Sequence, residues 1–482
     1  MTGTSDFSKI AKNTIFLNAA TVVTRGLSFI TSMVIARYLG ESGFGRYTFA
    51  LCFSGMFVIL TDLGLSYLTV REVARDKSIA GKYLGHNLVI RTVFGIITFA
   101  LIFIAVTMMD YPHEVETAVH ILAFFTIMKC VGSSFGAIFM AFERMGLVAL
   151  LDVIISALIL GGILAGIYLE YDLINLIRIY PAAVIVYICL SFILVVRTCA
   201  RPEYAFDFSF AWNLIRKSFP FALSSIFVII MSNIDTVMLK TMKGDIPAGY
   251  YGVTRALISV LVFIPANFTT VLYPVFSRYY QSSMDSLIKY YEQSFRLFLV
   301  MALPIAAGGM IVANGIIVLF YGQSYSPATP SLQIMVWALA IQFLSAVPGI
   351  LMLAVNRQKT ITLLSFAAVV LNIVLNVILI PRYSFVGASI ATLAAYSLIF
   401  ILILYIISRD IHRLEIWKVI WKPLLAALLM GVFAFCIREA NVFLVIALSA
   451  SFYLAALSGL GEIRRSDIDL LRRLIKPAIN PE

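Results

Sequence analysis

The sequence predicts an all-α polytopic membrane protein, on three observations. Of its 482 residues, 61% are hydrophobic and 13% are charged, and the mean hydropathy is +0.97. About fourteen apolar stretches each approach the ~20 residues that a helix needs to cross a bilayer. Basic residues concentrate in alternate connections, which is the pattern of the positive-inside rule. Soluble domains do not combine these properties.

The apolar stretches and their polar boundaries set the predicted spans. These are 13–38, 47–70, 88–109, 117–140, 147–168, 173–196, 219–240, 250–276, 294–320, 328–354, 361–380, 386–407, 423–440 and 442–460. No cleavable signal pattern precedes the first span, so we expect that span to be retained.

The basic residues orient the spans. With a cytoplasmic N-terminus, the outer connections carry Arg46, Lys240, Lys243, Arg382 and Arg438. The cytoplasmic connections carry many more, among them Arg71, Arg75, Lys77, Lys82, Arg197, Arg201, Arg216, Lys217, Arg409, Arg413, Lys418 and Lys422. The bias predicts a multi-pass protein of the plasma (inner) membrane with both termini in the cytoplasm.

A weak internal repeat relates the two halves of the chain. GFGRY at 43–47 and PAGYY at 247–251 each follow the first span of a six-span unit. MAFER at 140–144 and LAVNR at 353–357 each follow the fourth span. Because six is an even number, the two units share one orientation, and a pseudo-twofold axis along the membrane normal is predicted to relate them.

The repeat gives the predicted domain organisation. Residues 1–196 form an N-terminal six-helix bundle, and residues 216–407 form a C-terminal one. Residues 408–482 hold an interfacial segment, two extra transmembrane helices and a basic cytoplasmic tail. SRDIHRLEIWKVIWK at 408–422 mixes tryptophan, isoleucine and basic residues, which suits a helix at the inner membrane surface.

A polar face runs along the predicted 13–38 helix. Its members recur every three or four positions: Thr14, Asn18, Thr21, Arg25, Ser28 and Ser32. A charge at the bilayer centre costs ~3 kcal/mol or more, so such a face is expected to line a water-filled cavity. The alternative is that Arg25 only pairs with a buried aspartate. We favour the cavity because a single ion pair does not require a polar stripe along most of a helix.

Ionisable residues inside the other spans are also functional candidates. They are Asp62, Lys129, Asp152, Arg178, Asp235 and Arg255. Asp62, in TDLGLSYLTVRE, could instead shape a helix break together with Gly64. Lys129 and Asp152 are expected to form a structural ion pair. Arg178 lies near the end of its span and could extend its side chain outward.

Arg25 and Arg255 belong to different halves and point to an anionic cargo. Arginine binds phosphate oxygens in bidentate fashion, and a low-dielectric surrounding strengthens the attraction. We therefore predict substrate binding by Arg25 and Arg255, with Asn18 and Ser28 on the polar face contributing. Asp62 and Asp235 are the candidate cavity acids. A proton or sodium ion could couple to either of them.

Signatures of enzymes and metal sites are missing from the sequence. There is no G-x-x-x-x-G-K-[ST] or H-E-x-x-H pattern, and the four histidines are scattered. The five cysteines do not pair by spacing, so no disulfide, metal site or cofactor is expected. The short, acid-poor outer connections argue against a glycan polymerase or ligase. The net charge of +11 is explained by the membrane rather than by nucleic acid.

Several stretches resemble polysaccharide exporters of the multidrug/oligosaccharidyl-lipid/polysaccharide (MOP) superfamily. ARYLGESGFGRYTFA at 36–50 and DLGLSYLTVREVAR at 62–75 resemble the opening of these exporters. NIDTVMLK at 233–240 and AGYYGVTRA at 248–256 resemble the start of their second half. The 354–392 stretch is the most specific, with Asn372 and Asn376, then Ile380-Pro381, then Gly387-Ala388. The order and spacing of these motifs extend the resemblance over nearly the whole chain.

The resemblance implies a flippase similar to O-antigen translocases. It would move a polyprenyl-diphosphate-linked oligosaccharide from the cytoplasmic to the outer leaflet by alternating access through a basic central cavity. Arg25 matches a cavity cation of related flippases, and Asp235 matches a common acidic position. The expected partners are a lipid-linked anionic oligosaccharide, membrane lipids and other glycan assembly proteins, and no nucleic acid is expected to bind. The chain is expected to act as a monomer. The alternatives are a multidrug cation antiporter of the same superfamily and a lipid II flippase.

Overall fold

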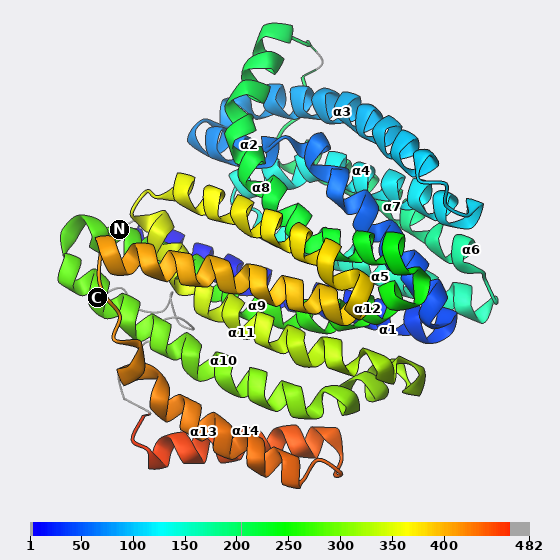
Figure 1. Cartoon of the computed structure of the whole chain (residues 1–482). Coiled ribbons are helices and arrows are strands. Elements are labelled where there is room, and N and C mark those ends of the chain that lie inside the picture. Colours follow the sequence, from blue (N-terminus) through cyan, green and yellow to red (C-terminus); the bar gives the residue numbers. More distant parts are fainter. Residues whose placement is uncertain (1–2, 204, 463–482) are drawn as a thin grey trace. The chain divides into compact units, whose positions relative to one another are not determined.

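The computed structural model describes residues 3–203 and 205–462, without the side chains of residues 3–18, 224 and 416. This part of the chain contains fourteen α-helices and two short 3-10 helices, η1 and η2 (Figure 1). The first half comprises α1 (Gly3–Asp62), α2 (Leu65–Arg75), η1 (Lys77–Ile79), α3 (Ala80–Met108), α4 (His113–Ala141), α5 (Met145–Tyr168), α6 (Leu173–Ile177), α7 (Ile179–Thr198) and α8 (Phe208–Lys243). The second half comprises α9 (Asp245–Ser282), α10 (Met284–Tyr321), η2 (Gln323–Ala328), α11 (Thr329–Ala354), α12 (Gln358–Asp410), α13 (Ile416–Cys436) and α14 (Val442–Gly459).

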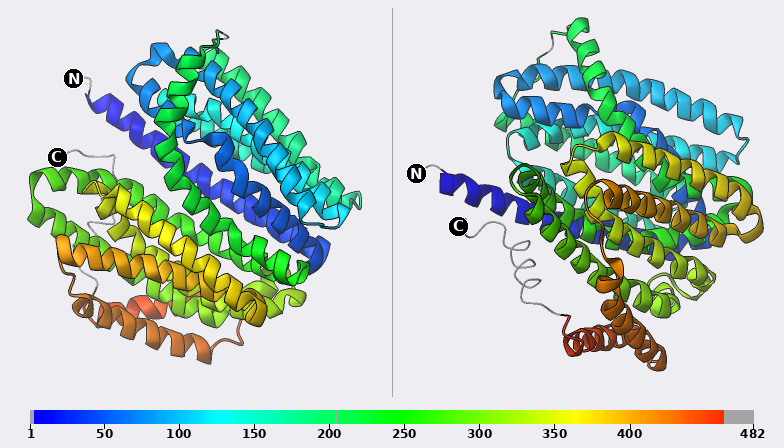
Figure 2. Two further views of the ribbon diagram at one scale, coloured as in Figure 1. Left: turned by 45° about the horizontal axis from the view of Figure 1, so that its top comes forward. Right: turned by 60° about the vertical axis from the view of Figure 1, so that its left-hand side comes forward.

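Twelve helical segments of the described chain are long and apolar enough to cross a membrane. The fourteen predicted spans correspond to these twelve segments because α1 and α12 each contain two spans that meet at a sharp turn. α1 turns at Gly40, whose φ of 66° is readily adopted by glycine. Figure 2 shows its blue ribbon running away from the N-terminus and then doubling back. α12 turns at Ser384, with a φ of 52°. The predicted all-α membrane fold is therefore confirmed.

By its internal contacts the chain divides into two compact units, residues 1–249 and 250–482. Unit 1 contains α1 to α8 and the first residues of α9. Within it, α8 packs against α1 and α2, although the repeat assigns that helix to the C-terminal bundle. The pseudo-twofold relation of two six-helix bundles stays a prediction.

α4 is the central helix of unit 1. It packs against α1, α2, α3 and α7, and more than half of its residues are buried. Small residues allow these close contacts: a Cβ at Gly132 would lie 2.8 Å from a ring carbon of Tyr187 on α7. Side chains of α4 therefore reach several neighbouring helices at once.

In unit 2, α11 packs against both α10 and α12, and α13 and α14 pack against α10 (Figure 1). The Tyr453 hydroxyl of α14 donates to the Val300 carbonyl of α10 at 2.9 Å. The 408–422 segment forms no separate helix, because α12 ends at Asp410 and α13 begins at Ile416. The predicted basic tail beyond Glu462 lies outside the described residues.

Candidate functional site

A buried ion pair joins α3 to the end of α1. The side chain of Arg91 on α3 is 0% exposed, and its Nη2 donates to Asp62 Oδ1 at 2.5 Å and to Ser66 Oγ at 2.7 Å. Its Nη1 donates to the Cys130 carbonyl at 2.8 Å and to the Ser133 hydroxyl at 2.5 Å. Burying such a charge is costly unless it is paired and hydrogen-bonded, as the two terminal nitrogens of Arg91 are. Arg91 therefore ties α1, α2, α3 and α4 together.

Asp62 shapes the break between α1 and α2. Its carboxylate accepts the Gly64 N–H at 3.1 Å and the Ser66 hydroxyl at 2.8 Å. Leu63 and Gly64 both have positive φ angles, 48° and 76°. A Cβ at Gly64 would lie 2.5 Å from the Ser218 carbonyl oxygen of α8, so only glycine fits without a shift. This geometry agrees with the alternative considered for Asp62, a helix break shaped together with Gly64, and its role as a cavity acid stays a prediction.

Sequence reasoning did not identify Arg91. It lies three residues into the predicted 88–109 span, where a basic side chain usually extends to the membrane surface. The available signal was Asp62 itself, because a carboxylate inside a span needs a cationic or hydrogen-bonding partner.

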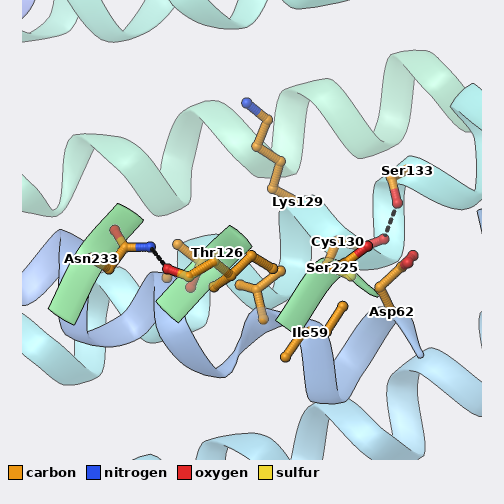
Figure 3. Close-up of a pocket in the computed structure, with 11 residues that line it drawn as sticks. Ile59, Asp62, Thr126, Lys129, Cys130, Ser133, Ser225 and Asn233 are labelled. Atoms are coloured by element: carbon orange, nitrogen blue, oxygen red, sulfur yellow. Dashed lines mark hydrogen bonds between the residues drawn. The ribbon is translucent and has the colours of Figure 1, made fainter. Parts of the chain in front are cut away.

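A pocket of about 490 Å³ lies within unit 1, between α1, α4 and α8. Its polar lining consists of Asp62, Thr126, Lys129, Ser133, Ser225 and Asn233, and its apolar lining includes Val58, Ile59 and Ile229. Figure 3 shows Asn233 and Asp62 toward opposite ends, with Lys129 extended to one side. This volume lies in the range of small-molecule sites, which are typically about 300–1,000 Å³.

Lys129 and Asp152 do not form the predicted ion pair among the described side chains. Lys129 is exposed and lines the pocket, whereas Asp152 is half-buried on α5 and lies outside the lining. The charge of Lys129 still acts on the Asp152 carboxyl, so the two residues are near one another. Arg178 is exposed where α6 meets α7 and donates to Asn175 Oδ1 at 2.9 Å.

The predicted phosphate ligands fall in separate units. Arg25 is half-buried on α1 in unit 1, and Arg255 is half-buried on α9 in unit 2. Ser28 is exposed on α1, and the Asn18 side chain lies outside the described part. Asp235 on α8 is 4% exposed. The roles of all five residues in substrate binding or ion coupling stay predictions.

A second charged cluster, the Arg46–Asp245 cluster, lies at the turn between α8 and α9. Arg46 Nε donates to Asp245 Oδ2 at 3.1 Å, and its Nη1 pairs with Glu114 of α4. Lys240 pairs with the other oxygen of Asp245. The cluster lies in the connections predicted to face outward.

Two glycines bring the repeated motifs GFGRY and PAGYY into contact. A Cβ at Gly45 would lie 1.9 Å from the Asp245 carbonyl oxygen, and one at Gly249 would lie 2.2 Å from the Glu41 carbonyl oxygen. Side chains larger than hydrogen cannot occupy these positions without moving the backbone. The two repeated motifs therefore meet at a backbone contact, and the ion pair of Arg46 and Asp245 lies beside it.

Comparison with known proteins places this chain among membrane exporters. The model of the polysaccharide biosynthesis protein family matches residues 10–280, and the MatE model matches residues 220–378. The "Probable low-salt glycan biosynthesis flippase Agl15" of Haloferax volcanii is 21% identical over 432 residues, which are 88% of this chain and 89% of that protein. The "Putative O-antigen transporter" of Shigella flexneri is 22% identical over 380 residues, or 74% of this chain and 88% of that protein. The uncharacterized membrane protein MJ1068 of Methanocaldococcus jannaschii is 20% identical, but the match spans only 45% of its length.

Solved structures share the fold at low identity. An inward closed conformation of the lipid II flippase MurJ superposes with a TM-score of 0.78 and 16% identity, covering 95% of this chain and all of that one. An inward-facing MATE-family multidrug transporter of the MOP superfamily gives a TM-score of 0.66 and 15% identity, covering 79% and 94%. The resemblance inferred from the motifs is confirmed. Because the family model matches more than half of the sequence, this multi-pass membrane chain belongs to the polysaccharide biosynthesis protein family, within the MOP superfamily of flippases and transporters.

Proposed function

We propose that the chain is a flippase that moves a polyprenyl-diphosphate-linked oligosaccharide from the cytoplasmic to the outer leaflet. The observation that carries this proposal is the match, over 88% and 74% of the chain, to proteins described as a glycan biosynthesis flippase and an O-antigen transporter. Charged side chains within membrane-spanning helices support it, because such residues often mark the pathway of a substrate or an ion.

The proposed mechanism is alternating access through a basic central cavity. Arg25 and Arg255 hold the diphosphate, Asn18 and Ser28 contribute polar contacts, and the prenyl tail stays in lipid. Binding energy from the charged headgroup offsets the loss of hydration inside the membrane. The chain acts as a monomer in the plasma membrane, with both termini in the cytoplasm.

A proton or sodium gradient drives the proposed cycle through an acidic side chain. Asp62 already accepts hydrogen bonds from Arg91, Ser66 and Gly64, so its carboxylate is engaged in fixing the local structure. We therefore assign the coupling role to Asp235, which is buried on α8. Asp62 keeps the architectural role of fixing the α1–α2 break.

The test is transport by the purified full chain in proteoliposomes. A fluorescent polyprenyl-diphosphate oligosaccharide is placed in both leaflets, and an impermeant quencher reports how fast it exchanges between them. The proposal predicts exchange well above that of protein-free vesicles. Exchange at the protein-free rate, from protein that is folded and correctly inserted, would refute it.

A multidrug cation antiporter is the second candidate, and the MatE match to residues 220–378 favours it. It predicts uptake of a lipophilic dye cation by the same vesicles under a proton or sodium gradient. The polar face that carries Arg25 weighs against this cargo, because a cation would be repelled there. A lipid II flippase, suggested by the fold shared with MurJ, would exchange lipid II in preference to other lipid-linked glycans.

A further inference from the structure

We propose that the pocket between α1, α4 and α8 is a subsite for an acidic sugar residue, and that Lys129 selects its carboxylate. The inference rests on the proposed flippase function, since it concerns the glycan part of the cargo. It assigns to unit 1 a contact that is separate from the diphosphate ligands Arg25 and Arg255.

The position of Lys129 requires water. The residue lies near the middle of α4, one of the helices long enough to cross the membrane, and its side chain is exposed. A lysine at this depth is tolerated when it faces a water-filled chamber rather than lipid. The pocket of about 490 Å³ that Lys129 lines is the chamber in the described part of unit 1 that meets this requirement.

The charge balance of the pocket favours an anion. Two charged side chains line it, Asp62 and Lys129. Asp62 is neutralised by Arg91, which is itself fully buried behind the lining. Asp152 is near Lys129 but belongs to α5 and not to the pocket wall, and no ion pair joins the two. Among the lining residues, Lys129 therefore carries the charge that no ion pair neutralises.

The remaining polar atoms match sugar hydroxyls. Thr126 and Ser225 donate their hydroxyl hydrogens to carbonyls of their own helices, Leu122 at 2.9 Å and Phe221 at 3.2 Å. Ser133 donates to the Cys130 carbonyl at 2.7 Å. Each hydroxyl oxygen keeps lone-pair capacity for a donor. Sugar hydroxyls are such donors, and Val58 and Ile59 offer apolar contact to a sugar ring.

The pocket also lies where cargo would be loaded. Its Asp62 end is followed directly by α2, whose Arg71 and Arg75 belong to the connection predicted to be cytoplasmic. Gly55 and Asn233 line it further along α1 and α8. A sugar entering from the cytoplasmic leaflet would meet this chamber on its path.

The experiment measures binding of three probes to the purified full chain in detergent by saturation-transfer NMR. The probes are glucuronate, glucose and inorganic diphosphate. We expect glucuronate to bind about tenfold more tightly than glucose, the ratio that one charge-assisted contact produces. Lys129→Gln should make the two sugars equal, and Lys129→Arg should keep the preference. Lys217→Gln, an exposed lysine of α8 outside the pocket, is the matched control and should change nothing.

Three outcomes overturn the subsite. If glucuronate and glucose bind equally to the wild type, the pocket has no preference for a carboxylate. If Lys129→Gln still prefers glucuronate, Lys129 is not the residue that selects it. Displacement of glucuronate by diphosphate identifies a phosphate subsite instead. Failure of the proposed function is separate: it would appear as a wild-type chain that does not exchange a lipid-linked glycan of neutral sugars.

Discussion

Arg91 Nη2 lies 2.5 Å from Asp62 Oδ1, and this pair lies where α1, α2, α3 and α4 meet in unit 1. The arginine is fully buried, and the carboxylate is the last residue of α1. Removing Asp62 alone would leave the fully buried Arg91 charge without its carboxylate, and removing Arg91 alone would leave Asp62 without its cation. The pair therefore sets the geometry of the α1–α2 break and of the pocket beside it.

Replacing Arg91 with methionine should destabilise the protein by about 3–5 kcal/mol, because an uncompensated carboxylate remains. The measurement is thermal unfolding of the purified chain in detergent. The double variant Asp62→Asn with Arg91→Met should recover most of the loss, since it removes both charges. If the double variant is as unstable as the two single losses added together, the residues are not coupled.

Gly64→Ala should destabilise the chain by about 1–3 kcal/mol, since the left-handed backbone is strained for alanine. The added methyl would also approach the Ser218 carbonyl at 2.5 Å. The control is Gly161→Ala in the α5 helix, where nothing lies within 4 Å of the new Cβ. That change should be neutral or stabilising, because alanine favours helix over glycine. Equal unfolding temperatures for the two variants would contradict the assignment of strain to Gly64.

Asp245→Asn should weaken the Arg46–Asp245 cluster, because Arg46 and Lys240 would both lose their ion pair with the Asp245 carboxylate. Arg46 and Asp245 are partly exposed, but the Lys240 side chain is only 7% exposed and would lose its carboxylate partner, so we expect a loss of about 1–3 kcal/mol in the unfolding free energy. The effect should shrink in 1 M salt, where the Debye length is about 3 Å. Lys243→Gln, an exposed lysine three residues after Lys240, is the control and should show no such salt dependence.

Most of the fold could be predicted from the hydrophobicity of the spans and the charge bias of their connections. Each predicted span is mostly helical, because a membrane-spanning segment must satisfy its backbone within itself. Two of them, 47–70 and 173–196, cross a helix boundary, at Leu63 and Gly64 and at Arg178. The turn in α1 was predicted as a connection, but the sequence does not show that Gly40 makes it within a continuous helical ribbon. The interfacial segment at 408–422 was predicted from composition. Its two tryptophans lie in the first turns of α13, whereas Arg409 and Arg413 precede that helix, and its place at the membrane surface stays a prediction.

The site was predicted less completely than the fold. Asp62 was identified because a carboxylate inside a span is rare, and Arg91 was passed over because a cation near a span end is common. The pairing of these residues joins positions 29 apart on different helices, which no local pattern encodes. The Gly45 and Gly249 contact could be noticed as a repeat, but its meaning required the backbone distance.

The central claim is that positive charge in the first membrane crossing binds the phosphates of a lipid-linked glycan. Its most direct test is the exchange rate of a polyprenyl-diphosphate oligosaccharide in proteoliposomes containing Arg25→Glu, with Arg178→Gln as the exposed control. We predict loss of exchange in Arg25→Glu at an unchanged unfolding temperature, and a wild-type rate in Arg178→Gln. Exchange by Arg25→Glu at the wild-type rate would contradict the account.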